Sequence, residues 1–197
     1  MTGESEPAEW PVDLRGVTET VTTTLGPNGR WNAAALGVHA GDPVSARTWG
    51  NTRTRRNFSR QGEGYVQFTV DPLLFVEAAV GIEEREEPVL DEADAWVHVT
   101  ADRIRTGESG GTDWAEWALR PVDAAVVRER VPSINRGFGA VVEATVAASR
   151  LGVASYDRTE LEAQLDYFAD VVDRCGGERE RAAFDRLVEL SEWDGAD

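Results

Sequence analysis

The chain has no lysine, a single cysteine and only two histidines among its 197 residues. Without lysine it cannot build the phosphate-binding loop of P-loop nucleotide hydrolases, whose motif requires one. The lone Cys175 excludes an internal disulfide and a cysteine-rich zinc site. His39 and His98 are too few for most histidine-based metal sites. We therefore expect a protein with neither a disulfide nor a metal ion.

Long hydrophobic runs are also missing. No apolar stretch approaches the roughly 18 residues that a membrane-spanning helix needs. The first residues, MTGESEPAEWPVD, are acidic and polar, unlike a secretory signal peptide. We therefore expect a cytoplasmic protein that does not bind a membrane.

The charge is strongly one-sided, with 36 acidic residues against 20 arginines and a formal net charge of −16. A high net charge keeps a protein soluble, and halophiles use it to adapt to salt. Together with the absence of lysine, it indicates a salt-adapted, haloarchaeal protein. The acidity is then an adaptation to the environment and says little about a basic partner.

One long window lacks carboxylates. Between Thr20 and Gly62 the only acidic residue is Asp42, whereas six arginines lie there. The window carries a net charge of +5, and the remainder of the chain carries −21. The arginines are Arg30, Arg47, Arg53, Arg55, Arg56 and Arg60. Such a segregation of charge indicates that this part of the chain faces an anion.

Hydrophobic patterning predicts a run of strands followed by a run of helices, which is typical of the α+β class. The predicted strands are 16–24, 31–38, 44–49 and 64–70, with a long hairpin of 95–105 and 113–130. The spacing of Trp114 and Trp117 leaves a helical alternative open for the second hairpin segment.

Helix-capping residues predict five helices. Thr52 or Thr54 would cap a helix over 54–61, and Asp71 followed by proline would begin a second over 71–81. Thr159 and Glu162 form a capping-box pattern. The three later helices are predicted over 135–151, 159–177 and 179–192. The acidic segment 82–94 is predicted to be a surface connection.

The stretch GNTRT, at 50–54, has the chemistry of a phosphate site. It joins a strand to a helix, and helix N-termini offer backbone N–H groups to anions. Arginine adds a planar set of donors that suits phosphate. We predict that Asn51, Thr52, Arg53 and Thr54 hold one phosphate, with Arg53 as its main ligand. The plainer interpretation is that these arginines pair with the many acids elsewhere in the chain.

Two other segments could contact a ligand. Asn32 begins a strand that continues with three alanines, a flat surface on which a planar ring could lie. Ordinary tight packing or a dimer interface would explain the same residues. Arg136, in NRGFG at a helix start, could reach a phosphate or a ring carbonyl, or could simply be a surface arginine.

Three stretches, VTTTLGPNGRWNAAALGV, RTWGNTRTRRNF and NRGFGAVVEATVAASRL, together resemble a known family. They are similar to an archaeal group of uncharacterised flavoproteins with the FMN-binding split β-barrel fold, distant relatives of flavin reductases and flavoredoxins. The resemblance extends from about Trp10 to Leu190. It implies a barrel domain over 10–131, a C-terminal helical subdomain over 132–192, and flexible termini at 1–9 and 193–197.

The resemblance also implies a cofactor, a site and a partner. FMN would lie at the interface of a homodimer, its ring against the strand containing NAAALGV and its phosphate against TWGNTRTRRN. The better-known reductases use a serine-rich loop with lysine at the phosphate, whereas this chain has Asn, Thr and Arg. The implied cofactor-binding residues are Asn32, Ala33, Ala34, Thr48, Asn51, Thr52, Arg53, Thr54, Asn57 and Arg136, with Arg47 and Arg56 as further candidates.

Three functions remain open at this point. The first is an FMN-binding flavoprotein, and an FMN-dependent oxidoreductase would be one example. The second is a module for single-stranded nucleic acid, in which Arg47–Arg60 supply charge while Trp49 and Phe58 stack on bases. Its weakness is that the remaining −21 repels a polyanion. The third is a non-catalytic dimeric scaffold whose arginines form ion pairs. No residue is distinguished as a catalytic acid or base.

Overall fold

The computed structural model describes residues 8–193, and the chain divides into two compact units. The first unit extends to Thr69 and includes Glu84–Glu129. The second combines Val70–Glu83 with the chain from Arg130 onward. The segment 70–83 therefore clusters with the C-terminal helices, although it lies within the range that the resemblance assigns to the barrel.

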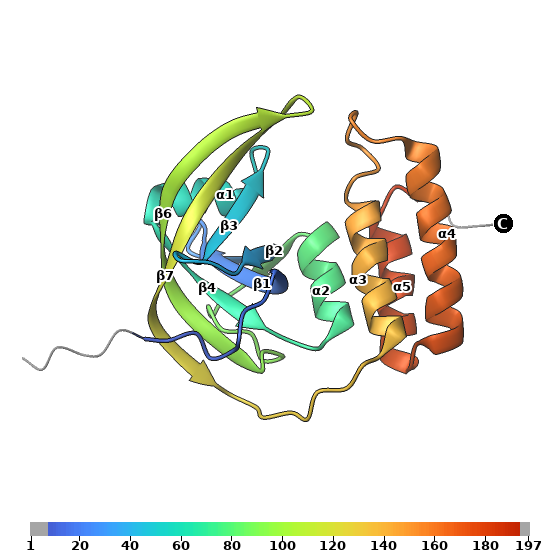
Figure 1. Cartoon of the computed structure of the whole chain (residues 1–197), viewed down its shortest axis with the longest axis horizontal. Helices are drawn as coiled ribbons and strands as arrows, with labels where there is room; N and C mark the ends of the chain where they lie inside the picture. Colours follow the sequence, from blue (N-terminus) through green and yellow to red (C-terminus); the bar gives the residue numbers. More distant parts are fainter. Residues whose placement is uncertain (1–7, 194–197) are drawn as a thin grey trace, which may run out of the picture. The chain divides into compact units, whose positions relative to one another are not determined.

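The first unit is a closed, six-stranded antiparallel barrel, which confirms the predicted fold class (Figure 1). Neighbouring strands follow the order β1-β4-β6-β7-β3-β2, and pairing of β2 with β1 closes the ring. The strands are β1 (Val17–Leu25), β2 (Trp31–His39), β3 (Ser45–Trp49), β4 (Glu63–Phe68), β6 (Ala95–Ser109) and β7 (Thr112–Val126). The predicted hairpin is thus a pair of strands, and the helical alternative at Trp114 and Trp117 is wrong.

Strands β2 and β3 share few paired residues. These strands pair only at Val38 with Ala46 and at His39 with Ser45. By contrast, β1 pairs with β2 along all nine residues. A short strand, β5 (Glu83–Arg85), also joins the sheet beside β2. On the edge of β2 that faces away from β1, β3 therefore covers only the last two residues, and β5 pairs along another part of the same edge.

Helix α1 (Arg53–Gln61) packs on the barrel and contacts β1, β2, β3, β4 and β6. It begins after the N-cap Thr52, one of the two predicted caps. Its Phe58 is 1% exposed and joins the barrel core, where its ring centre lies 5.4 Å from that of Trp117. The helix is therefore anchored by an aromatic side chain, and its first turn is held in a fixed place.

The second unit consists of four helices around their own hydrophobic core (Figure 1). They are α2 (Pro72–Val80), α3 (Arg136–Ala148), α4 (Arg158–Cys175) and α5 (Glu178–Leu190). As predicted, Asp71 caps α2 by accepting bonds from the N–H groups of Leu73 and Leu74. Trp193 is buried in this core, within a range predicted to be flexible. Residues 1–7 and 194–197 of the predicted termini lie outside the described part of the chain.

Two local predictions were wrong. Helix α4 begins at Arg158, and its cap is Asp157, whose carboxylate accepts from the N–H groups of Thr159 and Glu160. The predicted capping box fails because Asp157 offers a good acceptor two residues earlier, and Glu162 bonds Arg158 instead. The acidic segment 82–94 is more than a connection, since it contains β5 and bonds to the barrel.

Candidate functional site

The side chains at the start of β2 alternate between the two faces of the barrel wall. Leu36 and Val38 belong to the barrel core, so Asn32 and Ala34, at the same parity, face the interior. Ala33 faces the opposite side and is also buried. The three predicted ring-lining residues therefore cannot all present side chains to one ligand. The surface that they share is the main-chain edge of β2.

Two predicted phosphate ligands lie within the barrel and use their side chains internally. The Thr48 hydroxyl donates to the carbonyl oxygen of Ala115 at 3.3 Å and accepts from the indole N–H of Trp117 at 2.9 Å. The Asn57 amide donates to the hydroxyl of Thr24 at 3.0 Å. Both residues are buried, at about 3% exposure. Their contact with a phosphate stays a prediction.

The loop before α1 is shaped by Gly50 and Thr52. Gly50 has a φ of 62°, in the left-handed region that favours glycine, and its N–H donates to the carbonyl of Asp113 at 2.7 Å. The hydroxyl of Thr52 accepts from the N–H of Arg55 at 3.2 Å. The first turn of α1 contains no acidic residue. The N–H groups of Arg53 and Thr54 precede the helical hydrogen-bond ladder, so this turn can bind an anion.

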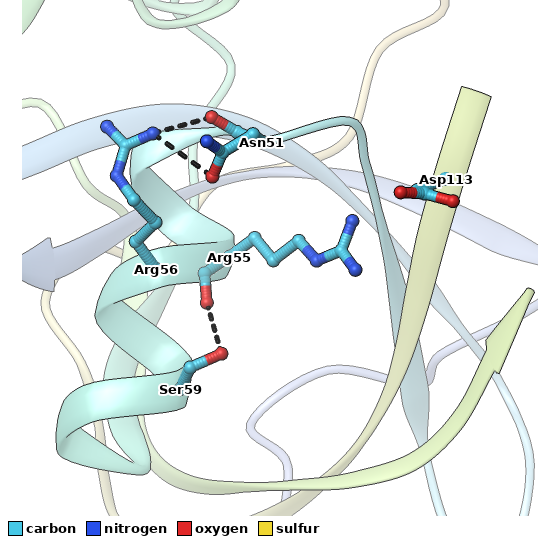
Figure 2. A pocket seen from close by; sticks show the side chains of 5 residues that line it. All are labelled: Asn51, Arg55, Arg56, Ser59 and Asp113. Carbon is cyan, nitrogen blue, oxygen red and sulfur yellow. Dashed lines mark hydrogen bonds between the residues drawn. The ribbon is translucent and has the colours of Figure 1, made fainter.

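Three arginines of α1 bond to main-chain carbonyls. Arg55 donates to the carbonyl of Gly50 at 2.9 Å, and Arg56 donates to the carbonyl and side-chain oxygens of Asn51 at 2.6 and 3.3 Å (Figure 2). Arg60 donates to the carbonyl of Leu25 at 2.5 Å. These side chains hold the loop and the neighbouring turn in place.

Arg53 instead forms an ion pair with Glu84 of β5, at 2.8 Å between Nη1 and Oε1. The same carboxylate accepts from the side-chain amide of Asn28, at 3.3 and 3.2 Å to its two oxygens. Arg30 lies 3.9 Å from its second oxygen. Glu84 therefore brings a carboxylate to the window that has almost none of its own, and it was not among the predicted site residues. The signal available was the acidic run at 83–87.

Arg47 lies in an aromatic setting on the outer face of β3. Its guanidinium carbon is 4.4 Å from the ring centre of Trp114 and 5.7 Å from that of Trp49. Its Nη2 also lies 3.6 Å from a carboxylate oxygen of Glu116. These contacts hold Arg47 in the barrel wall, although its buried Nε has no hydrogen-bond partner among the described residues, and its role at a phosphate stays a prediction.

A surface pocket of about 480 Å³ opens beside α1 (Figure 2). Its lining includes Asn51 of the predicted phosphate residues and the further candidate Arg56. Arg55 extends across it, and Asp113 stands on the opposite wall (Figure 2). Ser59 also lines the pocket.

Arg136 belongs to the second unit, where it is exposed at the first position of α3. The cap of that helix is Asn135, whose side-chain oxygen accepts from the N–H of Gly137 at 2.7 Å. The assignment of Arg136 to the ligand site stays a prediction.

A half-buried aromatic cluster lies on the outer face of the barrel. Tyr65 stacks on His98 with 4.7 Å between ring centres and meets Trp31 edge-on at 5.4 Å. Burial raises the pKa of Tyr65 above its usual value, and the charges of Glu63 and Asp123 raise it further. Its hydroxyl therefore stays protonated at neutral pH, and it cannot act there as a general base.

The described helices include none that is long and apolar enough to cross a bilayer.

The site thus combines a turn that can bind an anion, two arginines with an amide around one carboxylate, and a strand, β2, that β3 pairs at only two residues. Such a set can hold a phosphate group and offer main-chain hydrogen bonds to a planar ring. Among the described residues it contains no arrangement of nucleophile and general base.

Solved structures provide a comparison across almost the whole chain. An FMN-bound protein of Methanosarcina mazei, assigned to the family DUF447, is 26% identical, with a TM-score of 0.75 over 90% of this chain and 96% of its own. A styrene monooxygenase flavin reductase of Pseudomonas putida is 10% identical, with a TM-score of 0.44 over 59% of this chain and 93% of its own. An FMN-binding protein of Thermus thermophilus is 14% identical, with a TM-score of 0.39 over 63% of this chain and 82% of its own.

Two family models match the chain in sequence order. Residues 18–128 match the model of the N-terminal domain of DUF447, a protein of unknown function. Residues 135–189 match a second DUF447 model, also described as a protein of unknown function. Together they span both units, in agreement with the resemblance to an uncharacterised flavoprotein family. The chain belongs to the DUF447 family.

Proposed function

We propose that this protein binds FMN, with the phosphate at the start of α1 and the ring along β2. The observation that carries the proposal is the first turn of α1. It combines N–H groups outside the helical ladder with Arg53, in a turn that has no acidic residue. The Methanosarcina relative of the same family is FMN-bound, which supports the choice of this phosphate ester.

The residues present fit such a group. Asn28 and Arg53 already donate hydrogen bonds to the Glu84 carboxylate, so this surface can bind an anion. Bound FMN would supply redox chemistry, while the protein supplies binding and orientation. Arg53 would neutralise the phosphate, and the bonds from Arg55 and Arg56 to the loop would fix the turn around it.

The oxidoreductase activity and the homodimer belong to the same proposal. A second copy of the chain would cover the face of the ring that points away from β2. Mass measurement with and without FMN would test this, since a monomer that binds FMN at full affinity excludes an interfacial site. Reduction of the bound flavin by a nicotinamide nucleotide, followed by its absorbance, would test the activity.

The nucleic-acid alternative loses its main support. A polyanion would need outward-facing arginines and free aromatic faces. However, Arg55, Arg56 and Arg60 bond to main-chain carbonyls, and Phe58 is buried, so of the two predicted stacking residues Trp49 alone is exposed, at 46%. The three arginines and Phe58 form the scaffold of the helix start and not a stacking platform.

The direct test is an FMN titration of the purified protein, followed by quenching of flavin fluorescence. We expect Arg53→Ala to weaken FMN binding by roughly tenfold or more, because a charge-assisted bond to phosphate contributes about 1.5–3 kcal/mol. Arg103→Ala is the matched control, since it removes the same charge from an exposed position of β6. Equal losses in the two variants would show a general charge effect, and no FMN binding by the unmodified protein would refute the proposal.

A further inference from the structure

The Glu84 carboxylate lies in a cradle of three donors that come from two separate segments. Asn28 is in the turn between β1 and β2, Arg30 directly precedes β2, and Arg53 begins α1. Its two oxygens lie 2.8 to 3.9 Å from these donors. We refer to Asn28, Arg30 and Arg53 as the anion cradle.

Glu84 is the inner member of its acidic run. Its side chain is 31% exposed, against 85% for Glu86, which lies 3.5 Å from Arg30 on the rim. The main chain of Glu84 has its own attachments, because β5 pairs beside β2 and the Glu84 carbonyl accepts from Nη2 of Arg30 at 3.1 Å. The carboxylate can therefore leave the cradle while β5 stays attached.

The half-buried charge compensation of the cradle comes from one carboxylate, because its second carboxylate contact is on the rim. Arg30 and Arg53 share the 31% exposed Glu84, whereas Glu86, 3.5 Å from Arg30, is 85% exposed. A phosphate monoester carries up to two negative charges and three terminal oxygens, so it matches two guanidinium groups and an amide better. The neighbouring N–H groups at the start of α1 add to this preference.

We propose that the anion cradle is a phosphate-monoester site and that Glu84 is its exchangeable internal ligand. The inference rests on the proposed function, since it assigns Asn28 and Arg30 to the FMN phosphate beside Arg53. Glu84 keeps the cradle filled until a phosphate ester displaces its carboxylate. Ligands with no phosphate leave the ion pair intact and gain nothing from the cradle.

The test compares Glu84→Gln with Glu86→Gln, which remove the same charge from the same segment. Glu84→Gln is expected to bind FMN roughly fivefold more tightly, because a half-exposed ion pair no longer has to be broken. Its affinity for riboflavin, which has no phosphate, is expected to stay unchanged. Glu86→Gln is expected to change FMN affinity by less than twofold, and Arg30→Gln is expected to weaken it while sparing riboflavin.

A second measurement separates this inference from the proposed function. Inorganic phosphate, added at constant ionic strength, is expected to raise the melting temperature of Glu84→Gln more than that of Glu86→Gln. If neither the variants nor the unmodified protein bind FMN, but phosphate still gives this difference in melting temperature, the anion cradle is supported as a phosphate site and the proposed FMN binding is refuted. If FMN binds but Glu84→Gln leaves its affinity unchanged or weaker, the exchange is refuted. Equal gains for FMN and riboflavin would refute it too, because the phosphate would then play no part.

Discussion

Helix α3 offers a sharp test of the packing in the helical unit, because two glycines in its first turns have opposite surroundings. A Cβ on Gly137 would lie 2.4 Å from the Cα of Gly176 and 2.7 Å from its nitrogen. Both contacts are with backbone, which cannot rotate away. A Cβ on Gly139 would meet nothing within 4 Å. Alanine should therefore be harmful at the first position and harmless at the second.

The magnitudes follow from that difference. Gly139→Ala should stabilise the unit by about 0.5–1 kcal/mol, because alanine loses less backbone entropy than glycine in a helix. Gly137→Ala gains the same propensity but forces α3 away from Gly176, at a cost of about 1–3 kcal/mol for an overpacked contact. We therefore expect the two variants to change the free energy of unfolding in opposite directions.

Urea denaturation at constant potassium chloride would measure both effects, with circular dichroism at 222 nm following the helices. The midpoint should fall for Gly137→Ala and rise for Gly139→Ala, with an unchanged slope. Similar midpoints for the two variants would refute the close contact between Gly137 and Gly176. Gly137→Ser in place of alanine should lower the midpoint further, since it enlarges the same clash.

Two predictions concern the barrel. Phe58→Ala should lower the free energy of unfolding by about 3–5 kcal/mol, because it leaves a cavity beside Trp117 that the core cannot fill; an unchanged urea midpoint would contradict the anchoring of α1. Tyr65 should ionise at a higher pH in the folded protein than in the unfolded chain, whose phenol has a pKa near 10.0. The stability from its raised pKa is present below about pH 10 and is lost as the pH rises through the folded pKa. Absorbance at 295 nm, with Tyr65→Phe to identify the transition, would measure this, and a Tyr65 transition at or below the unfolded value would contradict it.

Much of the fold follows from short-range patterns in the sequence. Asp71 with Pro72 marks the start of α2, and Thr52 marks the start of α1, since caps depend on neighbours within four residues. Alternation predicts the long hairpin of β6 and β7 for the same reason. The exception is α4, where Asp157 rather than Thr159 supplies the cap, because two acceptors compete within one turn.

The site was harder to predict because its contacts are distant in sequence. The segregation of charge indicated Arg53 as a site residue. Its partner Glu84 lies 31 residues away, on a three-residue strand that no local sequence pattern predicts. Arg55 and Arg56 bond to carbonyls five residues back, and a count of charges cannot distinguish such bonds from ligand contacts. Strand geometry also separates Ala33 from Ala34, although the sequence presents them as one surface.

The bonds from arginines to carbonyls have a consequence for how salt acts on this protein. In molar salt the screening length falls to about 3 Å, so attraction between separated surface charges is weak. A guanidinium held at 2.6–2.9 Å from a carbonyl depends on direct contact rather than on a long-range field. The loop at Gly50 and Asn51 should therefore keep its shape from dilute buffer to brine. The Glu84 carboxylate and the proposed FMN phosphate compete for Arg53 through their charges. Salt concentration should therefore change how much of the protein binds FMN, while the loop around Arg53 keeps its structure.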